Sequence, residues 1–345
     1  MRLEHYRSVL TAQGPCATVE LAARTANAQA RSQMSLRWRE LIDRLSADGA
    51  DRAILQSLQR VRDEPPAGVE ESNGRVVVAN RDGVVFDELT DVVEHDGARL
   101  ASLPHIAPYL RRLAGSCRQV VVVADSAGAD VHEYLLPGAQ RGQPAPVDSA
   151  HVVGSSVLPL HKPRNGHLAH RRIQQRVDEA AHSNAADVIE HLRGVVARFQ
   201  PSVVVLAGQV RARQEIRHQL PAELADLVTE ARSGGTGPGE SASALHDELV
   251  DIATSAAADH AEETAEEFGG RLERRLAVQG VAETASAAVL DAVDTLLFEQ
   301  GVPVTAQLLI GPKPQQLGSR VDQLAALGAA DPQPADAADA LLRAC

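Results

Sequence analysis

The residues with the clearest chemistry lie in one stretch, 161–176, which reads HKPRNGHLAHRRIQQR. The stretch holds five lysine or arginine side chains and no acidic one, and its three histidines add positive charge when protonated. Its first half predicts a shaped loop, and its second half begins a long helix. Basic side chains beside a helix N-terminus, where backbone N–H groups are free, suit phosphate oxygens. The pattern predicts a nucleic-acid contact made by His161, Lys162, Arg164, Asn165, Gly166, His167, Arg171, Arg172 and Arg176.

A solvated helix start has the same charge pattern, and runs of like charge usually only keep a helix face wet. Two features favour binding. The loop joins a strand to a helix, where binding loops are commonly presented. The rest of the chain is acidic, since its 345 residues include 34 basic and 46 acidic side chains, a formal net charge of −12. Such a chain contacts nucleic acid only through a local basic surface. Aromatic residues make up 2%, which argues against a base-stacking surface for single strands.

A second basic stretch spans residues 24–39 and also lacks acidic residues. Arg24, Arg31, Arg37 and Arg39 are its candidate nucleic-acid-binding residues. The alternative is a helix with an ordinary polar face.

Metal and nucleophile chemistry have weaker support. The three cysteines show no CxxC spacing, and the sequence has neither a HExxH motif nor a GxSxG motif, so we expect no cofactor, no metal and no disulfide framework. Asp125 and Asp130 flank an expected hairpin and could hold Mg²⁺ for phosphodiester cleavage. Aspartates at a hairpin turn are more often turn formers, and a two-metal site needs further acids that the sequence does not identify.

The elements that must position these residues form an α/β (α+β) pattern in three domains. These are an N-terminal α+β domain at 1–116, a middle domain at 117–232, and a linker, long helix and C-terminal α/β domain at 233–345, which ends early for a sandwich of its kind. The expected helices are 3–13, 27–47, 51–62, 104–113, 169–199, 209–219, 240–279, 281–292, 319–327 and 335–344. The expected strands are 16–23, 75–79, 84–89, 119–125, 130–135, 151–157, 203–207, 224–230, 294–298 and 304–310. No signal peptide or membrane-spanning run is apparent, so a cytoplasmic protein is expected.

The stretch LPLHKPRNGHLAHRRIQQRVDEAAHSNAADVIEHL, residues 158–192, and the order of elements resemble the bacterial relatives of archaeal and eukaryotic peptide release factor and Pelota. Within these relatives the chain is most similar to the Balon-type ribosome hibernation factors of actinobacteria. The resemblance implies a middle domain with an RNase H-like sheet and a C-terminal domain like a small ribosomal protein.

In true release factors a Gly-Gly-Gln loop precedes the long middle-domain helix and positions water for peptidyl-tRNA hydrolysis. Here His161 to Leu168 fill that place, and the sequence contains neither Gly-Gly-Gln nor Asn-Ile-Lys-Ser. The resemblance therefore implies a non-enzymatic hibernation factor of the stress response. It would bind the 70S ribosome at the A site through 16S and 23S rRNA, with elongation factor Tu as a possible partner and no DNA or membrane.

Two other classes remain open from the sequence. One is an RNase H-like metal-dependent nuclease that uses Asp125 and Asp130. The other is a protein-interaction module whose contact surface is the acidic helical stretch 259–267, which has five carboxylates and no basic residue.

Overall fold

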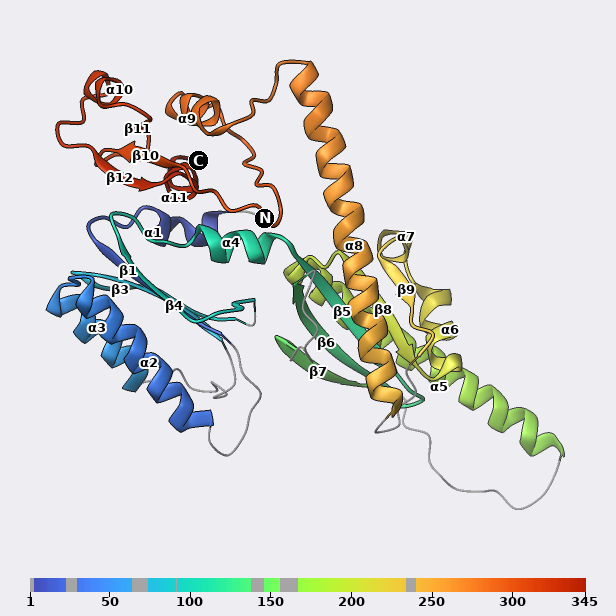
Figure 1. Ribbon diagram of the computed structural model, residues 1–345. Helices are drawn as coiled ribbons and strands as arrows, with labels where there is room; N and C mark the ends of the chain where they lie inside the picture. The colour runs from blue at the N-terminus through green and yellow to red at the C-terminus, as the bar shows by residue number, and fades with distance from the viewer. Residues whose placement is uncertain are drawn as a thin grey trace. The chain divides into compact units, whose positions relative to one another are not determined.

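The computed structural model describes residues 3–22, 30–63, 74–90, 92–137, 146–155, 167–233 and 240–345. They form a mixed α/β protein (Figure 1), which confirms the expected fold class. The chain divides into two compact units. We call residues 1–115 together with 264–345 the terminal unit, and residues 116–263 the middle unit. The finer division at 1–116, 117–232 and 233–345 stays a prediction.

The middle unit is built on a five-stranded sheet in the order β7-β6-β5-β8-β9. β5, β6 and β7 pair antiparallel, whereas β8 and β9 continue the sheet in parallel with β5. Gly208 ends β8 with φ +97°, and a Cβ there would lie 2.1 Å from the carbonyl oxygen of Ala124. Only glycine lets β8 end so close to β5. The strands are β5 (Ser116–Ala124), β6 (Gly128–Pro137), β7 (Asp148–Val153), β8 (Val203–Gly208) and β9 (Val228–Glu230).

One face of this sheet is covered by α5 (His167–Phe199), with α6 (Val210–Gln219) and α7 (Ala222–Ala225) beside it. Val188, Leu192 and Val195 of α5 are buried in the core against the sheet. The helix expected at 169–199 is confirmed, and these buried residues recur every three or four positions, as one face of a helix requires. α5 ends at Phe199 because Gln200 adopts φ +51° and Pro201 follows.

The opposite face of the middle sheet packs against α8 (Glu240–Glu273). Leu249 and Ala253 of this helix are buried against alternate residues of β5 and β8. The amide of Gln119, a fully buried polar side chain on β5, donates to the carbonyl oxygen of Leu249 at 3.2 Å. The sheet is therefore covered on both faces, which is why β8 is a continuous apolar run.

In the terminal unit, residues 3–114 form an antiparallel sheet in the order β3-β2-β1-β4 with helices on both faces. Trp38, Leu45 and Leu58 are buried on the α2 and α3 side. The strands expected at 75–79 and 84–89 are confirmed and form a hairpin, in which Asn80 pairs with Gly83 and its side chain accepts the N–H of Asp82 at 2.9 Å. The elements are η1 (Glu4–Tyr6), α1 (Arg7–Leu10), β1 (Cys16–Leu21), α2 (Ala30–Ala47), α3 (Arg52–Asp63), β2 (Arg75–Asn80), β3 (Gly83–Leu89), β4 (Gly97–Ala101) and α4 (Ala107–Ala114).

The C-terminal residues of the terminal unit form a small sheet in the order β11-β10-β12. Leu103, which follows β4, is part of the same hydrophobic core as Leu308 of β10 and Leu341 of α11. The elements are α9 (Val281–Val289), β10 (Gln307–Ile310), β11 (Leu317–Gly318), α10 (Val321–Ala326), β12 (Gln333–Asp336) and α11 (Ala337–Ala344).

Several expected elements differ in the structure. No strand forms at 294–298, although that segment is described. The strand expected at 224–230 begins only at Val228, because its first two residues belong to the helical turn α7. The strands β4, β11 and β12 were not expected. Their sequences are short and include alanine, glycine and proline, so pairing with distant strands sets their conformation.

Over the described residues, no helix is long and apolar enough to cross a membrane. Cys16 and Cys117 are buried free thiols, and Cys345 is an exposed one.

Glu88 lies next to an aromatic cluster in the terminal unit, made of Tyr6, Phe86 and Tyr109. The ring centroids of these three residues lie 5.9–6.4 Å apart. Burial raises the pKa of the adjacent Glu88, and the Tyr109 hydroxyl and the charge of His5 only partly offset that effect. The folded protein therefore holds the Glu88 proton more tightly than the unfolded chain does.

Because the pKa of Glu88 is raised on folding, this carboxyl should favour the folded state at pH values below its unfolded pKa of about 4.3. That contribution should disappear as the pH rises through the folded pKa. We expect Glu88→Gln to stabilise the protein more, relative to wild type, at pH 7 than at pH 4. Urea unfolding of both proteins at the two pH values measures this difference. A difference that is the same at both pH values would contradict the assignment.

Candidate functional site

The basic stretch 161–176 is attached to the middle unit at the start of α5. His167, Arg171, Arg172 and Arg176 lie on the first turns of this helix, before Ala180, the first of its described side chains that is buried. The loop residues His161, Lys162, Arg164, Asn165 and Gly166 lie outside the described residues. The structure therefore places the helical half of the predicted site at the N-terminal end of α5.

The two described residues after β7, Gly154 and Ser155, contact α5. The N–H of Ser155 donates to the Asp187 carboxylate at 2.7 Å, and the hydroxyls of Ser155 and Ser183 lie 3.0 Å apart. The N–H from Ser155 also lowers the pKa of Asp187, which keeps that carboxylate ionised. A Cβ on Gly154 would lie 2.1 Å from the side chain of Asn184, so only glycine permits this close approach.

The contact between Ser155 and Asp187 lies far from the start of α5. Asp187 lies 20 residues beyond His167 on a continuous helix, which corresponds to about 30 Å at 1.5 Å per residue. The described side chains of α5 that are buried begin at Ala180, four positions beyond Arg176 in sequence.

In the second basic stretch, Arg37 is held by an ion pair within the terminal unit. Arg37 forms an ion pair with Asp96, its Nε lying 2.6 Å from the carboxylate, and it donates to the carbonyl oxygen of Ala22 at 2.7 Å. It therefore has a structural role, and an rRNA contact by Arg37 would compete with Asp96. Arg39 is exposed, Arg31 lies on α2, and Arg24 lies outside the described residues. Their role as rRNA contacts stays a prediction.

The two aspartates of the nuclease alternative have different surroundings. Asp125 accepts the N–H groups of Ala127 and Gly128 at 2.7 and 3.0 Å, which is the geometry of a turn former. Asp130 pairs with His151 at 2.6 Å on the exposed part of the sheet. Within the described part of the chain, metal-ligating side chains gather in a group of three at one place, and that group contains neither aspartate.

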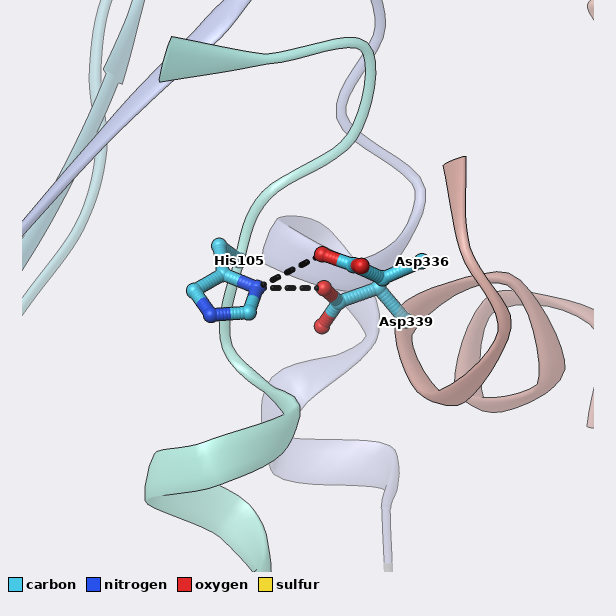
Figure 2. A group of neighbouring side chains, drawn as sticks. All are labelled: His105, Asp336 and Asp339. Carbon is cyan, nitrogen blue, oxygen red and sulfur yellow. Dashed lines mark hydrogen bonds and ion pairs between the residues drawn. The ribbon is translucent and has the colours of Figure 1, made fainter. Parts of the chain in front are cut away.

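That one group is His105, Asp336 and Asp339 in the terminal unit, whose ligating atoms lie within 4.8 Å of one another (Figure 2). It does not follow from the sequence. His105 and Asp339 are 234 positions apart, and neither belongs to a recognisable motif. Only the tertiary structure brings them together.

The acidic stretch 259–267 of the protein-interaction alternative lies on α8. Its five carboxylate residues, Asp259, Glu262, Glu263, Glu266 and Glu267, are all exposed. Glu267 pairs with Arg271 one turn later at 2.7 Å, which is an ordinary surface ion pair of a helix.

The middle of the chain is similar to a known protein family. Residues 118–274 match the model of bacterial archaeo-eukaryotic release factor family 2. This segment contains α5 and the basic residues at its start. The match supports the relationship to archaeal and eukaryotic release factors that the residues at 158–192 implied.

Other similarities extend over most of the chain. The chain is 29% identical over 338 residues to the uncharacterized proteins Rv2629 and MT2704 of two strains of Mycobacterium tuberculosis, covering 95% of this chain and 86% of each relative. Among solved structures, an archaeal protein matches 95% of this chain and 86% of its own at 14% identity, with a TM-score of 0.29. The archaeal translation termination factor aRF1 matches 86% of this chain and 84% of its own at 16% identity, with a TM-score of 0.28.

Proposed function

We propose that this protein is a ribosome hibernation factor of the Balon type, which occupies the ribosomal A site without releasing the nascent peptide. The observation that carries the proposal is the release-factor family match over residues 118–274. The basic stretch 161–176 lies inside that segment, in an otherwise acidic chain. A ribosomal site can be recognised by its shape together with a few phosphate contacts, so a net charge of −12 is compatible with binding.

The proposal assigns no catalytic step to the protein. Peptide release by the related factors depends on a Gly-Gly-Gln loop, and this sequence has none. Gly234 and Gly235 are followed by Thr236 and come after β9 in the sequence, more than 50 positions beyond the basic stretch. The protein would therefore exclude tRNA and shield rRNA of an idle ribosome rather than hydrolyse a peptidyl-tRNA ester.

The binding surfaces follow from the same assignment. Residues 161–176 would contact 23S rRNA near the peptidyl-transferase centre, and the N-terminal residues would lie near the 16S rRNA of the decoding centre. No codon-reading Asn-Ile-Lys-Ser motif is present, so binding should not depend on the mRNA codon. Elongation factor Tu is a candidate partner for delivery.

Purified protein should sediment with vacant 70S ribosomes and should release no peptide from ribosomes that hold a stop codon in the A site. A bacterial release factor with an intact Gly-Gly-Gln loop is the positive control for hydrolysis. Ribosomes programmed with several different A-site codons should bind the protein equally. Stop-codon-dependent hydrolysis above background would contradict the non-enzymatic assignment, and no co-sedimentation would contradict ribosome binding.

A further inference from the structure

Side chains from distant parts of the sequence meet in the terminal unit, where β4 leads into α4. His105 Nδ1 lies 2.8 Å from the Asp339 carboxylate and 3.3 Å from that of Asp336 (Figure 2). His105 precedes α4, Asp336 ends β12, and Asp339 lies on α11. Asp339 is only 4% exposed, so its charge must be compensated by the protein itself.

Asp339 also caps α4. Its Oδ1 accepts the backbone N–H groups of Ile106 at 3.1 Å and Ala107 at 2.8 Å. α4 has no capping side chain from its own segment, and Pro108 has no N–H to satisfy. The carboxylate therefore accepts hydrogen bonds from the first free N–H groups of α4, although Asp339 and Ala107 are 232 positions apart in sequence. Negative charge is favoured at this end of a helix.

Further contacts fasten the same two chain segments together. Arg99 Nη2 lies 2.8 Å from the Asp336 carboxylate, and the Ser102 hydroxyl donates to the carbonyl oxygen of Pro334 at 3.0 Å. Near the other end of α4, Arg111 donates to the carbonyl oxygens of Glu299 and Val302 at 2.9 and 2.6 Å. Both ends of α4 are thus held by residues from the C-terminal part of the chain.

The charges in the cluster favour an ion-pair network over a metal site. One histidine and two carboxylates could ligate a divalent cation. However, the Asp336 oxygen that faces His105 also receives the Arg99 guanidinium, and Asp339 already uses one oxygen for two N–H groups. The neighbouring Arg112 of α4 is engaged elsewhere, since it pairs with Glu20 at 2.8 Å.

We propose that His105, Asp336 and Asp339 form a latch that fixes the C-terminal segment 307–345 to α4. In this latch Asp339 caps the helix, while His105 and Arg99 hold the two aspartates in place. A single residue, Gly115, separates α4 from β5, so the latch holds the last helix of the terminal unit before the chain continues into β5. The terminal unit then moves as one body rather than as separate N- and C-terminal domains. This inference does not depend on ribosome binding.

Amide hydrogen exchange of the full chain tests the cap. Asp339→Ala should make the Ile106 and Ala107 amides exchange at least about tenfold faster, because a charge-assisted hydrogen bond is worth about that factor in the opening equilibrium. The matched control is Asp331→Ala, which removes an exposed carboxylate between α10 and β12. The control should leave both amides as in wild type. Unchanged exchange in a folded Asp339→Ala protein would overturn the proposal.

A second pair of variants tests the positioning role if Asp339→Ala fails to fold. His105→Asn keeps an N–H donor near the place of Nδ1, whereas His105→Leu removes it. We expect His105→Leu to speed exchange at Ile106 and Ala107, and His105→Asn to restore most of the protection. Equal exchange in the two variants would overturn the role of His105. A zinc-dependent rise in the melting temperature of wild type that is absent in Asp336→Asn would instead show a metal site and would overturn the latch.

Discussion

Ribosome binding is expected to weaken by about 100-fold or more when Arg164→Glu and Arg171→Glu are combined, because removing one charge-assisted hydrogen bond costs at least about 1.5 kcal/mol. One of these residues lies in the loop and the other on α5. Binding to phosphate releases counterions, so the slope of log affinity against log salt should fall by roughly 0.7–0.9 for each phosphate that the variant no longer neutralises. Sedimentation with 70S ribosomes at several salt concentrations measures both quantities.

The control for this prediction is a pair of arginines outside both basic stretches. Arg44 and Arg274 are exposed, and Arg44→Glu combined with Arg274→Glu changes the net charge by the same amount. This control should keep nearly the wild-type salt slope. The free energy of unfolding of both double variants should lie within about 0.5 kcal/mol of wild type, since surface substitutions rarely cost more. Unchanged ribosome binding in a folded Arg164→Glu, Arg171→Glu protein would show that 161–176 is only a solvated helix start.

The parts of the fold that could be predicted are those with strong local signals. The valine-rich β5 and β8 were expected because a strand covered on both faces is apolar throughout. α5 was expected because its apolar residues recur every three or four positions along the whole helix. The strands β2 and β3 were expected, and Asp82-Gly83 between them is a local turn signal, because glycine supplies the backbone freedom that the turn requires.

The parts that could not be predicted depend on partners far away in sequence. β12 includes Pro334 and has no alternation of apolar residues, and it is a strand because it pairs with β10. Arg37 has the sequence context of a nucleic-acid contact, yet Asp96, 59 positions later, holds it inside the unit. The latch at His105 could not be predicted either, because no local pattern distinguishes Asp339 from a solvated helix residue.

The position of the basic stretch relies on the packing of α5, and Leu192 is the side chain at the centre of that packing. It is fully buried, with 0% exposure, among residues of β5, β6 and β8. Leu192→Ala should destabilise the middle unit by about 3 kcal/mol, because the truncated side chain buries less apolar surface and leaves a cavity. Val210→Ala, at an exposed position on α6 of the same unit, is the matched control and should cost less than about 0.5 kcal/mol.

The chain offers a way to assign the Leu192 effect to one unit. Its single tryptophan, Trp38, is buried in the terminal unit, so tryptophan fluorescence reports the unfolding of that unit alone. Far-ultraviolet circular dichroism reports both units. In Leu192→Ala, the dichroism transition in urea should shift to lower concentration, while the fluorescence transition stays at its wild-type midpoint. A shift no larger than that of Val210→Ala would mean that Leu192 does not hold α5 on the sheet. Ribosome binding of Leu192→Ala can then be measured at temperatures where the middle unit has unfolded and Trp38 is still buried. A loss of binding under these conditions would show that the basic end of α5 depends on the packing of that helix on the sheet.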